Sequence, residues 1–358
     1  MPEQAESSSD VNIPVQNIYY LLCYAWNKLD EKDRVAVSVE DSTTLVDLFA
    51  KILATATTSL LKRGIDREYI THTEEIPGLR GKLDVGTTLK RNTLQKGRTV
   101  CSFDELSANT LLNRILVSTI SNLTRTEGLD EDLRKQLHHL RGMLFNVSNI
   151  NITSSLFGQV RIHRNNRIYG FIMDVCEIIH QSLLPTESAG HYSFVDFTKD
   201  DRKMHQLFEK FVRNFYHVEQ STYTSRSRVL TWNFTEISEG ASQYLPRMST
   251  DISLQSNHRD IIIDTKYYSN TLQSNYETDK IHSSHLYQLT GYLIHQQDAE
   301  ERPHTMQTTG ILLYPTVQQE LDLCYSFEGH PVHIRTVNLN ATWKTIHNRL
   351  LGILNDAV

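Results

Sequence analysis

Two short runs, Leu245-Pro-Arg-Met-Ser-Thr-Asp-Ile-Ser-Leu254 and Asp260-Ile-Ile-Ile-Asp-Thr-Lys-Tyr-Tyr268, decide how this chain folds. Both are rich in apolar and β-branched residues, and the polar residues between them have the composition of a turn. The pattern predicts two strands joined in a hairpin. Because successive side chains of a strand point to opposite faces, Asp264 and Lys266 share one face, and pairing of the strands brings Asp251 beside Asp264.

Two carboxylates and an ammonium group at the end of an apolar hairpin suggest a particular chemistry. Carboxylate oxygens hold hard divalent cations, and an ammonium group can stabilise charge on a phosphate. Asp251 followed after a gap by Asp264-x-Lys266 resembles the motif of PD-(D/E)xK nucleases, with Pro246 some distance before the first acid. The alternative interpretation, an exposed strand end with an ordinary ion pair, is favoured by the motif alone. The rest of the chain has to decide.

Composition is typical of a globular protein with two or three domains. The chain has 358 residues, of which 39% are hydrophobic and 22% charged, so a sizeable core is available and disorder along the whole chain is excluded. The net charge of -6 argues against a protein that coats nucleic acid with a basic surface. We therefore expect DNA contacts to use local patches or to be delegated to a partner.

Cysteine usage and hydropathy predict a cytoplasmic protein. The four cysteines are far apart and form no C-x-x-C pair, which argues against a disulfide framework or a cysteine zinc site. The first ten residues lack the basic and apolar regions of a secretory signal, and no apolar run approaches the length of a membrane span. We expect no membrane association.

The first half of the chain is predicted to combine helices with a pair of strands. Residues 1–12 are expected to form a flexible tail. Apolar residues at helical spacing predict four helices. These begin after Pro14, at Ser42 as a cap, after Ser107 as a cap and near Glu131. Alternating residues between Arg67 and Phe103 predict strands.

A basic segment punctuated by glycine, from Arg80 to Arg98, interrupts these strands. Its basic residues stand against a single acid, Asp84, and are Arg80, Lys82, Lys90, Arg91, Lys96 and Arg98. Such a hairpin or loop suits contact with phosphate, or insertion into an acidic or nucleotide-bearing partner. A solvated loop is an equally favoured alternative.

A polar connection at residues 148–167 is the predicted domain junction, because its charged residues are all basic and its strand character is weak. We expect an N-terminal domain of residues 13–165 and a C-terminal domain of residues 166–358. The helix that follows the junction would open the second domain, and its apolar stripe is the expected place of Cys176.

Two helices of the second domain carry further candidate site residues. The strongly amphipathic segment from Met204 to Phe215 places Glu209 at the margin of its apolar stripe, where it is either a solvated flank residue or an acid near a metal. After the hairpin, a second helix carries Gln288 and Tyr292, which are four residues apart and share a face. Both residues are suited to reach the site and hold it in place.

The remaining segments complete an α/β core. His282-x-x-His285 has metal-ligand spacing but no third ligand nearby in sequence, so capping or surface roles are favoured. Buried or alternating strands are predicted at 310–315 and 332–336, with a closing helix at 343–354. The order helix, strand, strand, helix, strand, strand lets the acids, the lysine and the glutamine converge at one edge, which favours the nuclease interpretation.

Six segments spread over most of the chain resemble the McrC family, the nuclease subunits of McrBC restriction systems that cut methylated DNA. They are Ile13–Trp26, Glu75–Gly81, Thr99–Leu106, Leu245–Ile252, Ile263–Tyr268 and Leu286–Leu289. The opening segment and the nuclease motif are specific when they occur together.

The resemblance implies a division of labour between two proteins. The C-terminal half would be a PD-(D/E)xK nuclease domain, and the mixed α/β domain 13–165 would dock in a ring of an McrB-like AAA+ partner and stimulate its GTP hydrolysis. That partner would bind the GTP and read the modified cytosine in double-stranded DNA. The segment from Arg80 to Arg98 is the expected inserted tip. Thr265 stands where the family commonly has a small residue such as alanine, and we expect little effect because its side chain points to the other strand face.

The family's nuclease residues carry over to Asp251, Asp264 and Lys266. The two acids would hold one or two Mg²⁺, with the Thr265 carbonyl as a possible addition and with Glu209 as a third acid at a position that is not reliable in the family. Lys266 would orient or deprotonate the attacking water or stabilise charge, while Gln288 and Tyr292 position the site. Two alternatives stay open. One is a ring-binding GTPase activator with a scaffold nuclease domain, and the other is a stand-alone repair nuclease of the same fold.

Overall fold

The computed structural model describes residues 13–26, 44–163, 166–186, 190–267, 273–275, 278–297, 302–315 and 320–356. The predicted tail (1–12) and the predicted cap Ser42 lie outside these residues. The chain divides into two compact units. The sheet unit comprises Met1–Ser42 and Asp196–Val358, and the helical unit comprises Thr43–Val195.

A mixed six-stranded sheet forms the centre of the sheet unit. Its strands, in spatial order, are β14 (Asp322–Phe327), β15 (His330–Val337), β13 (Thr309–Pro315), β10 (Asp260–Thr265), β9 (Ile252–Gln255) and β6 (Thr224–Arg226). The three strands β10, β13 and β15 are parallel, and the outer strands join them antiparallel. The predicted α/β class is confirmed.

The hairpin predicted from the sequence is the pair β9 and β10. The two strands are antiparallel, with Ile252 opposite Ile263, and the turn is closed by the amide of Ser256, which donates to the Arg259 carbonyl over 3.0 Å. All six residues of β10 are buried. A strand that is covered on both faces in this way carries a continuous apolar run rather than an alternating pattern.

Helix α10 (Ser283–His295) covers one face of β10 and β13. Its Leu289 and Leu293 belong to an apolar cluster that also contains Ile262 and Leu312. The helix lies so close to β13 that a Cβ atom on Gly310 would come within 2.9 Å of a methyl group of Leu293. This close packing fixes the distance between α10 and the end of β10.

Aromatic side chains attach α1 (Val15–Ala25) to α9 (Asp201–Val218), the helix that packs on β6 and β10. The rings of Tyr24 and Phe211 lie 5.7 Å apart, and Tyr20 stacks on Trp343 at 4.7 Å. Trp343 begins α11 (Trp343–Asp356), which contacts β15. The prediction that α1 belongs to the N-terminal domain is therefore wrong, because its aromatic face is buried in the sheet unit.

The helical unit is built from α3 (Leu45–Arg63), α5 (Leu111–Leu123), α6 (Glu131–Met143), α7 (Ser154–Phe157) and α8 (Arg167–Ser182). Helix α8 packs on α3 and α5, and its Tyr169 hydroxyl donates to Asn113. Cys176 is buried in α8, as expected. Along the chain, the boundary between the two units falls between residues 195 and 196, and the predicted boundary between residues 165 and 166 is wrong. The reason is that the apolar stripe of α8 is buried against α3 and α5.

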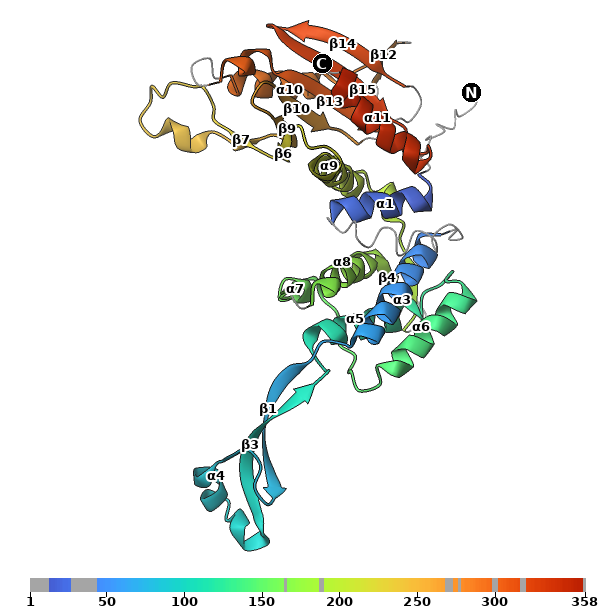
Figure 1. Ribbon diagram of the computed structural model, residues 1–358, viewed down its shortest axis with the longest axis vertical. Coiled ribbons are helices and arrows are strands. Elements are labelled where there is room, and N and C mark those ends of the chain that lie inside the picture. The colour runs from blue at the N-terminus through green and yellow to red at the C-terminus, as the bar shows by residue number, and fades with distance from the viewer. Residues whose placement is uncertain are drawn as a thin grey trace, which may run out of the picture. The chain divides into compact units, whose positions relative to one another are not determined.

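A long antiparallel ribbon of β1 (Glu68–Pro77) and β3 (Arg98–Ser107) projects from these helices, with α4 (Val85–Lys90) at its far end (Figure 1). The strands predicted between Arg67 and Phe103 are thus confirmed. The tip also contains β2 (Lys82–Leu83) and the 3₁₀ turn η1 (Thr93–Lys96). The basic segment is therefore an ordered tip rather than a simple loop.

Short elements connect these parts. They are β4 (Leu183–Pro185), β5 (Tyr192–Phe194), η3 (Phe197–Lys199), β7 (Val229–Leu230), η4 (Ala241–Tyr244), β8 (Met248–Ser249), β11 (Gln273–Asn275), β12 (Thr278–Lys280) and η5 (Pro303–Gln307). The helix caps differ from prediction, since Thr44 caps α3 and Thr110, rather than Ser107, caps α5. Among the described helices, none is long and apolar enough to cross a membrane.

Candidate active site

The hairpin brings Asp251 to the end of β10. Asp251 directly precedes β9, and the pairing of Ile252 with Ile263 sets it level with Asp264. Its Oδ2 atom accepts two hydrogen bonds from Thr265, from the amide over 2.9 Å and from the hydroxyl over 3.1 Å. The carboxylate is therefore held at the strand end by both the backbone and a side chain.

Asp264 is the most unusual group of this cluster, because its side chain is 0% exposed. Its Oδ2 atom pairs with Lys266 Nζ over 2.7 Å, and no other described residue donates a hydrogen bond to either carboxylate oxygen. Burial, and then the charge of Asp251, raise the pKa of Asp264 to about 7, against the opposing effect of Lys266. Near neutral pH this carboxyl is thus poised between its protonated and ionised forms.

Lys266 pairs with Asp264 and is close enough to His285 to affect its pKa. Its side chain is 7% exposed, and its amide donates to the Leu313 carbonyl of β13 over 3.0 Å. Burial, followed by the charges of Lys266, His282 and His205, lowers the pKa of His285 to about 4. His285 also contacts the Tyr314 hydroxyl over 2.9 Å. His285 is therefore neutral near Lys266 and leaves the ammonium as the local positive charge.

His282 and His285 have no third metal-ligating side chain gathered with them among the described residues. Their rings lie 4.9 Å apart and are tilted by 32°. His282 occupies the N-cap position of α10 without a side-chain capping bond. Of the predicted capping or surface roles, His282 has the cap position without the side-chain bond, and His285 is buried rather than on the surface.

Glu209 lies near the site but is paired with another residue. Its Oε1 accepts a hydrogen bond from Arg213 over 2.8 Å, and the same Arg213 nitrogen lies 3.4 Å from the Asp251 carbonyl oxygen. Glu209 is close enough to raise the pKa of Asp264. Glu209 therefore acts on Asp264 electrostatically, and Arg213 bridges Glu209 to the segment that carries Asp251.

Gln288 and Tyr292 are hydrogen-bonded to each other, and Tyr292 is also hydrogen-bonded to the strand before Asp251. The Gln288 amide donates to the Tyr292 hydroxyl over 2.7 Å, and that hydroxyl donates to the Ser249 carbonyl over 2.8 Å. Burial raises the pKa of Tyr292 to about 12, so the hydroxyl stays protonated and remains a donor. The pair therefore fastens α10 to β8, two residues before Asp251.

A divalent cation fits the donor set of Asp251 and Asp264. A buried carboxylate that lies beside a second carboxylate is stabilised by a cation placed between them. Across the described residues, no group of three or more His, Cys, Asp or Glu side chains is gathered closely enough to hold a metal. Mg²⁺ suits this sparse set because it keeps several waters and takes only one or two carboxylates together with substrate phosphates.

Two contributors to this geometry were not predicted. Thr265 was expected to have little effect, yet it donates both hydrogen bonds that fix Asp251. Arg213 was not considered, although it stands four residues after Glu209 on the same helix. The i, i+4 spacing of Glu209 and Arg213 was a usable signal. The role of the Thr265 amide follows only from the strand register.

The sequence from residue 4 to residue 315 matches the family described as McrBC 5-methylcytosine restriction system component. The chain belongs to this family. The relative named Type IV methyl-directed restriction enzyme EcoKMcrBC, from Escherichia coli strain K12, is 33% identical over 346 residues, which cover 96% of this chain and 98% of the relative. The resemblance inferred from the sequence segments is confirmed.

This McrBC family member also resembles a solved structure in its fold. The match is to a chain of the half-complex from a tetradecameric assembly of Thermococcus gammatolerans McrB AAA+ hexamers with bound McrC. The TM-score is 0.62 with 19% sequence identity, over 96% of this chain and 76% of that chain. The candidate site, from Glu209 to Tyr292, lies inside the family match.

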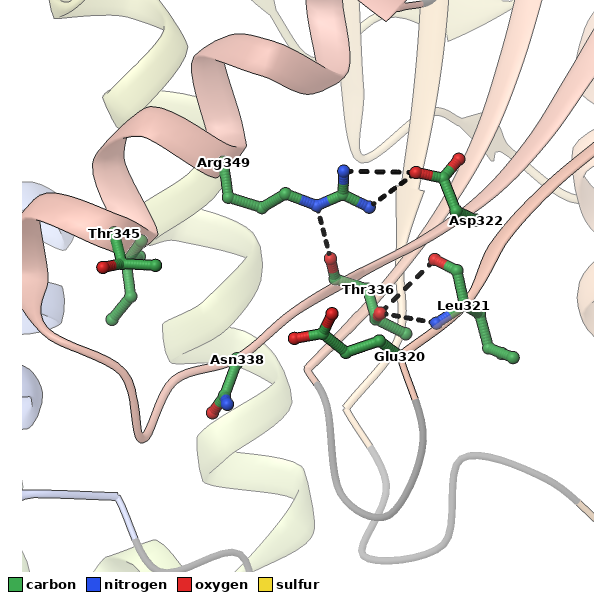
Figure 2. Close-up of a pocket in the computed structure, with 8 residues that line it drawn as sticks. Glu320, Leu321, Asp322, Thr336, Asn338, Thr345 and Arg349 are labelled. Atoms are coloured by element: carbon green, nitrogen blue, oxygen red, sulfur yellow. Dashed lines mark hydrogen bonds and ion pairs between the residues drawn. The ribbon is translucent and has the colours of Figure 1, made fainter.

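A separate pocket of about 260 Å³ in the sheet unit does not include the candidate site residues (Figure 2). It lies where α11 meets β15 and the start of β14. Figure 2 shows Arg349 reaching across it, with both terminal nitrogens 3.3 Å from an Asp322 oxygen and Nε 3.1 Å from the Thr336 carbonyl. These polar groups satisfy one another, which is typical of a structural contact between a helix and a sheet.

Proposed function

We propose that this McrBC family member is the DNA-cleaving subunit of its restriction system and hydrolyses phosphodiesters with Mg²⁺. The observation that carries the proposal is the buried carboxyl of Asp264, which lies beside Asp251, pairs with Lys266 and has a pKa raised to about 7. A second carboxylate and an ammonium group at the end of one strand are the chemistry of a PD-(D/E)xK nuclease site.

Each residue has a distinct role in this proposal. Asp251 and Asp264 hold the Mg²⁺, which polarises the scissile phosphate and lowers the pKa of a bound water. Lys266 orients the attacking water and stabilises negative charge that develops on the phosphate. Gln288 and Tyr292 keep the strand before Asp251 in place through the Ser249 carbonyl. Glu209 is a third acid whose access to the metal depends on its release from Arg213.

We further propose that the helical unit engages an McrB-like AAA+ GTPase ring. The support is the family membership, together with the similar fold of a chain in a solved assembly of McrB AAA+ hexamers with bound McrC. The tip of the β1–β3 ribbon presents exposed basic side chains suited to an acidic or nucleotide-bearing surface. The GTP and the recognition of methylated double-stranded DNA then belong to the partner.

A pure ring activator with an inactive sheet unit is the alternative. Burial of the Asp264 carboxyl beside a second carboxylate costs folding free energy, which the ion pair with Lys266 offsets only in part. A scaffold has no use for a buried Asp264 that would offset this cost, whereas a metal-dependent nuclease needs the carboxylate to bind its metal. The arrangement of Asp264 therefore favours the cleaving subunit.

Replacement Asp264→Asn tests the proposal. The loss of one metal carboxylate removes several kcal/mol of transition-state stabilisation, so we expect cleavage to fall by about a thousandfold. The measurement is cleavage of methylated DNA by the chain together with its GTPase partner and Mg²⁺. GTP hydrolysis by the partner is expected to be stimulated as before.

Glu320→Gln is the matched control, because Glu320 is an exposed acid of the same unit outside the site. It is expected to leave cleavage unchanged. Full cleavage by a correctly assembled Asp264→Asn complex would contradict the assignment of Asp264 as a metal ligand of the cleavage site. Loss of both cleavage and GTPase stimulation would instead indicate that the variant no longer assembles.

A further inference from the structure

Cys324 stands on the edge strand β14 in contact with an imidazole. It is directly opposite His333 in the antiparallel pairing of β14 and β15, and its Sγ atom lies 3.3 Å from His333 Nδ1. The thiol side chain is exposed. A nucleophile within hydrogen-bond reach of a base is the first requirement of an activated thiol.

A buried guanidinium completes the arrangement. Arg335 Nη2 lies 3.4 Å from Cys324 Sγ and 2.9 Å from His333 Nδ1, and the Arg335 side chain is 3% exposed. A guanidinium has only donors, so Nδ1 of His333 must be an acceptor here. Nδ1 therefore accepts from both the thiol and the guanidinium, and when the thiol proton moves to Nδ1 the guanidinium N–H is released to stabilise the thiolate.

The charges around His333 keep it in this neutral state. Burial, followed by the positive charges of Arg335 and Arg259, lowers the pKa of His333, while Asp322 and Asp356 oppose the shift. Asp322 also pairs with Arg335 and so orients the guanidinium. The thiol, the base and the orienting charges thus come from β14 and β15, with Asp356 at the end of α11.

The other cysteines differ from Cys324. Cys23, Cys101 and Cys176 are all buried, and burial raises the pKa of the Cys176 thiol to about 12. Thiols in apolar surroundings are inert, whereas exposed thiols beside cationic groups react. The three buried cysteines therefore serve as internal controls for the reactivity of Cys324.

We propose that Cys324 is a reactive thiol, activated by His333 and Arg335, and that hydrogen peroxide oxidises it. His333 receives the thiol proton, and the thiolate attacks one peroxide oxygen. An S–O bond forms, the O–O bond breaks, and the departing hydroxide takes the proton from His333 to leave as water. Cys324 is oxidised to the sulfenic acid and the peroxide is reduced to water, so one thiol and one peroxide give one sulfenic acid and one water.

The test measures sulfenic acid formation at each cysteine in the full chain. The protein is treated with hydrogen peroxide in the presence of a 1,3-dione probe that traps sulfenic acids, and labelled peptides are quantified by mass spectrometry over time. We expect label at Cys324 and none at the buried cysteines. His333→Asn is expected to slow labelling of Cys324 by about tenfold or more, since it removes the base.

His347→Asn is the matched control, because it removes an imidazole that is bonded to Glu219 instead of a thiol. Its labelling rate is expected to equal that of the unaltered chain. Equal rates in a folded His333→Asn protein would overturn the proposal.

A second measurement avoids any dependence on the folding of variants. In urea all four cysteines are exposed to the same solvent and should react alike. Cys324 of the native chain is expected to react faster than Cys324 of the unfolded chain, while the other three react more slowly. A native rate at or below the unfolded rate would also overturn the proposal.

Discussion

Asp264 is a residue whose ionisation opposes folding. Burial and the charge of Asp251 raise its pKa to about 7, well above the value of about 4 for an unfolded chain. A group with a raised folded pKa contributes its full stability below the unfolded pKa and loses it as pH rises through the folded pKa. The stability that Asp264 contributes is therefore lost between about pH 4 and pH 7.

Urea unfolding of the metal-free protein at several pH values measures this effect. Relative to Asp264→Asn, the unaltered chain is expected to lose on the order of 4 kcal/mol of unfolding free energy as pH rises through this range. The asparagine variant carries no charge at either end of the range and provides the reference curve. Parallel curves for the two proteins would show that Asp264 ionises as in an unfolded chain.

Thr265→Val isolates one of the two bonds that hold Asp251. Valine has nearly the same shape but lacks the hydroxyl that donates to Asp251 Oδ2, while the backbone amide still donates. A hydrogen bond to a charged group contributes about 1.5–3 kcal/mol, so we expect affinity for a divalent cation to fall by about tenfold. Calorimetric titration with Ca²⁺ measures this affinity without DNA.

Thr265→Ser is the control, because it keeps the hydroxyl and loses only a methyl group. It is expected to bind the cation with nearly the original affinity. If valine and serine weaken binding equally, packing of the methyl group rather than the hydrogen bond would be responsible.

At the residue scale, the sequence predicted that Asp264 and Lys266 share a strand face and that strand pairing brings Asp251 to them, and the structure brings these side chains together. The same rule misjudged Thr265. Alternation describes only where side chains point, but the Asp251 carboxylate accepts a hydrogen bond from the backbone amide of Thr265 at the end of β10. Only the register between the two strands reveals that contact.

At the scale of elements, α10 acts as a clamp on β8. Tyr292→Phe removes the donor to the Ser249 carbonyl and leaves the ring buried. We expect a loss of about 1 kcal/mol in unfolding free energy, the net value of such a bond. Tyr287→Phe, which alters a ring that is 75% exposed on the same helix, is expected to have no effect. A Tyr292→Phe protein as stable as the Tyr287→Phe protein would contradict the clamp.

Elements with strong patterns were predictable and those with weak patterns were not. The apolar stripe of α9 and the continuous apolar run of β13 are clear patterns in the sequence, and both elements were predicted from them. The edge strand β14 did not, because most of its residues are exposed and a strand with little burial has little pattern. Helix α4 was not predicted either, because glycine and threonine are poor helix formers. The helix begins at Asp84, which accepts a hydrogen bond from the Thr87 amide.

At the scale of the whole molecule, composition located a polar connection but misplaced the boundary. A polar segment marks where the chain is exposed, and it says nothing about which core buries the next helix. Tyr169 of α8 bonds to Asn113 in the helical unit. Tyr24 of α1 packs on Phe211 in the sheet unit, nearly two hundred residues later in the chain. Such long-range partners cannot be read from local periodicity.

A charge reversal at the ribbon tip tests the proposed partner contact. The variant replaces three exposed basic residues by glutamate, namely Lys90, Arg91 and Lys96. Like charges would then face an acidic partner surface, so we expect stimulation of the partner's GTPase to fall by about tenfold or more at low salt. The double exchange Lys62→Glu and Lys135→Glu elsewhere on the helical unit is the control. Unchanged stimulation by the tip variant would remove the tip from the interface.

The β1–β3 ribbon also has a mechanical consequence. Each strand has 10 residues, and at about 3.3 Å per residue the ribbon reaches about 33 Å. Over most of that length it is only two strands wide, and β1 is mostly exposed. Such a ribbon is marginally stable in water by itself. Limited proteolysis would therefore be expected to cut it in the isolated chain and to spare it once a binding partner grips both edges.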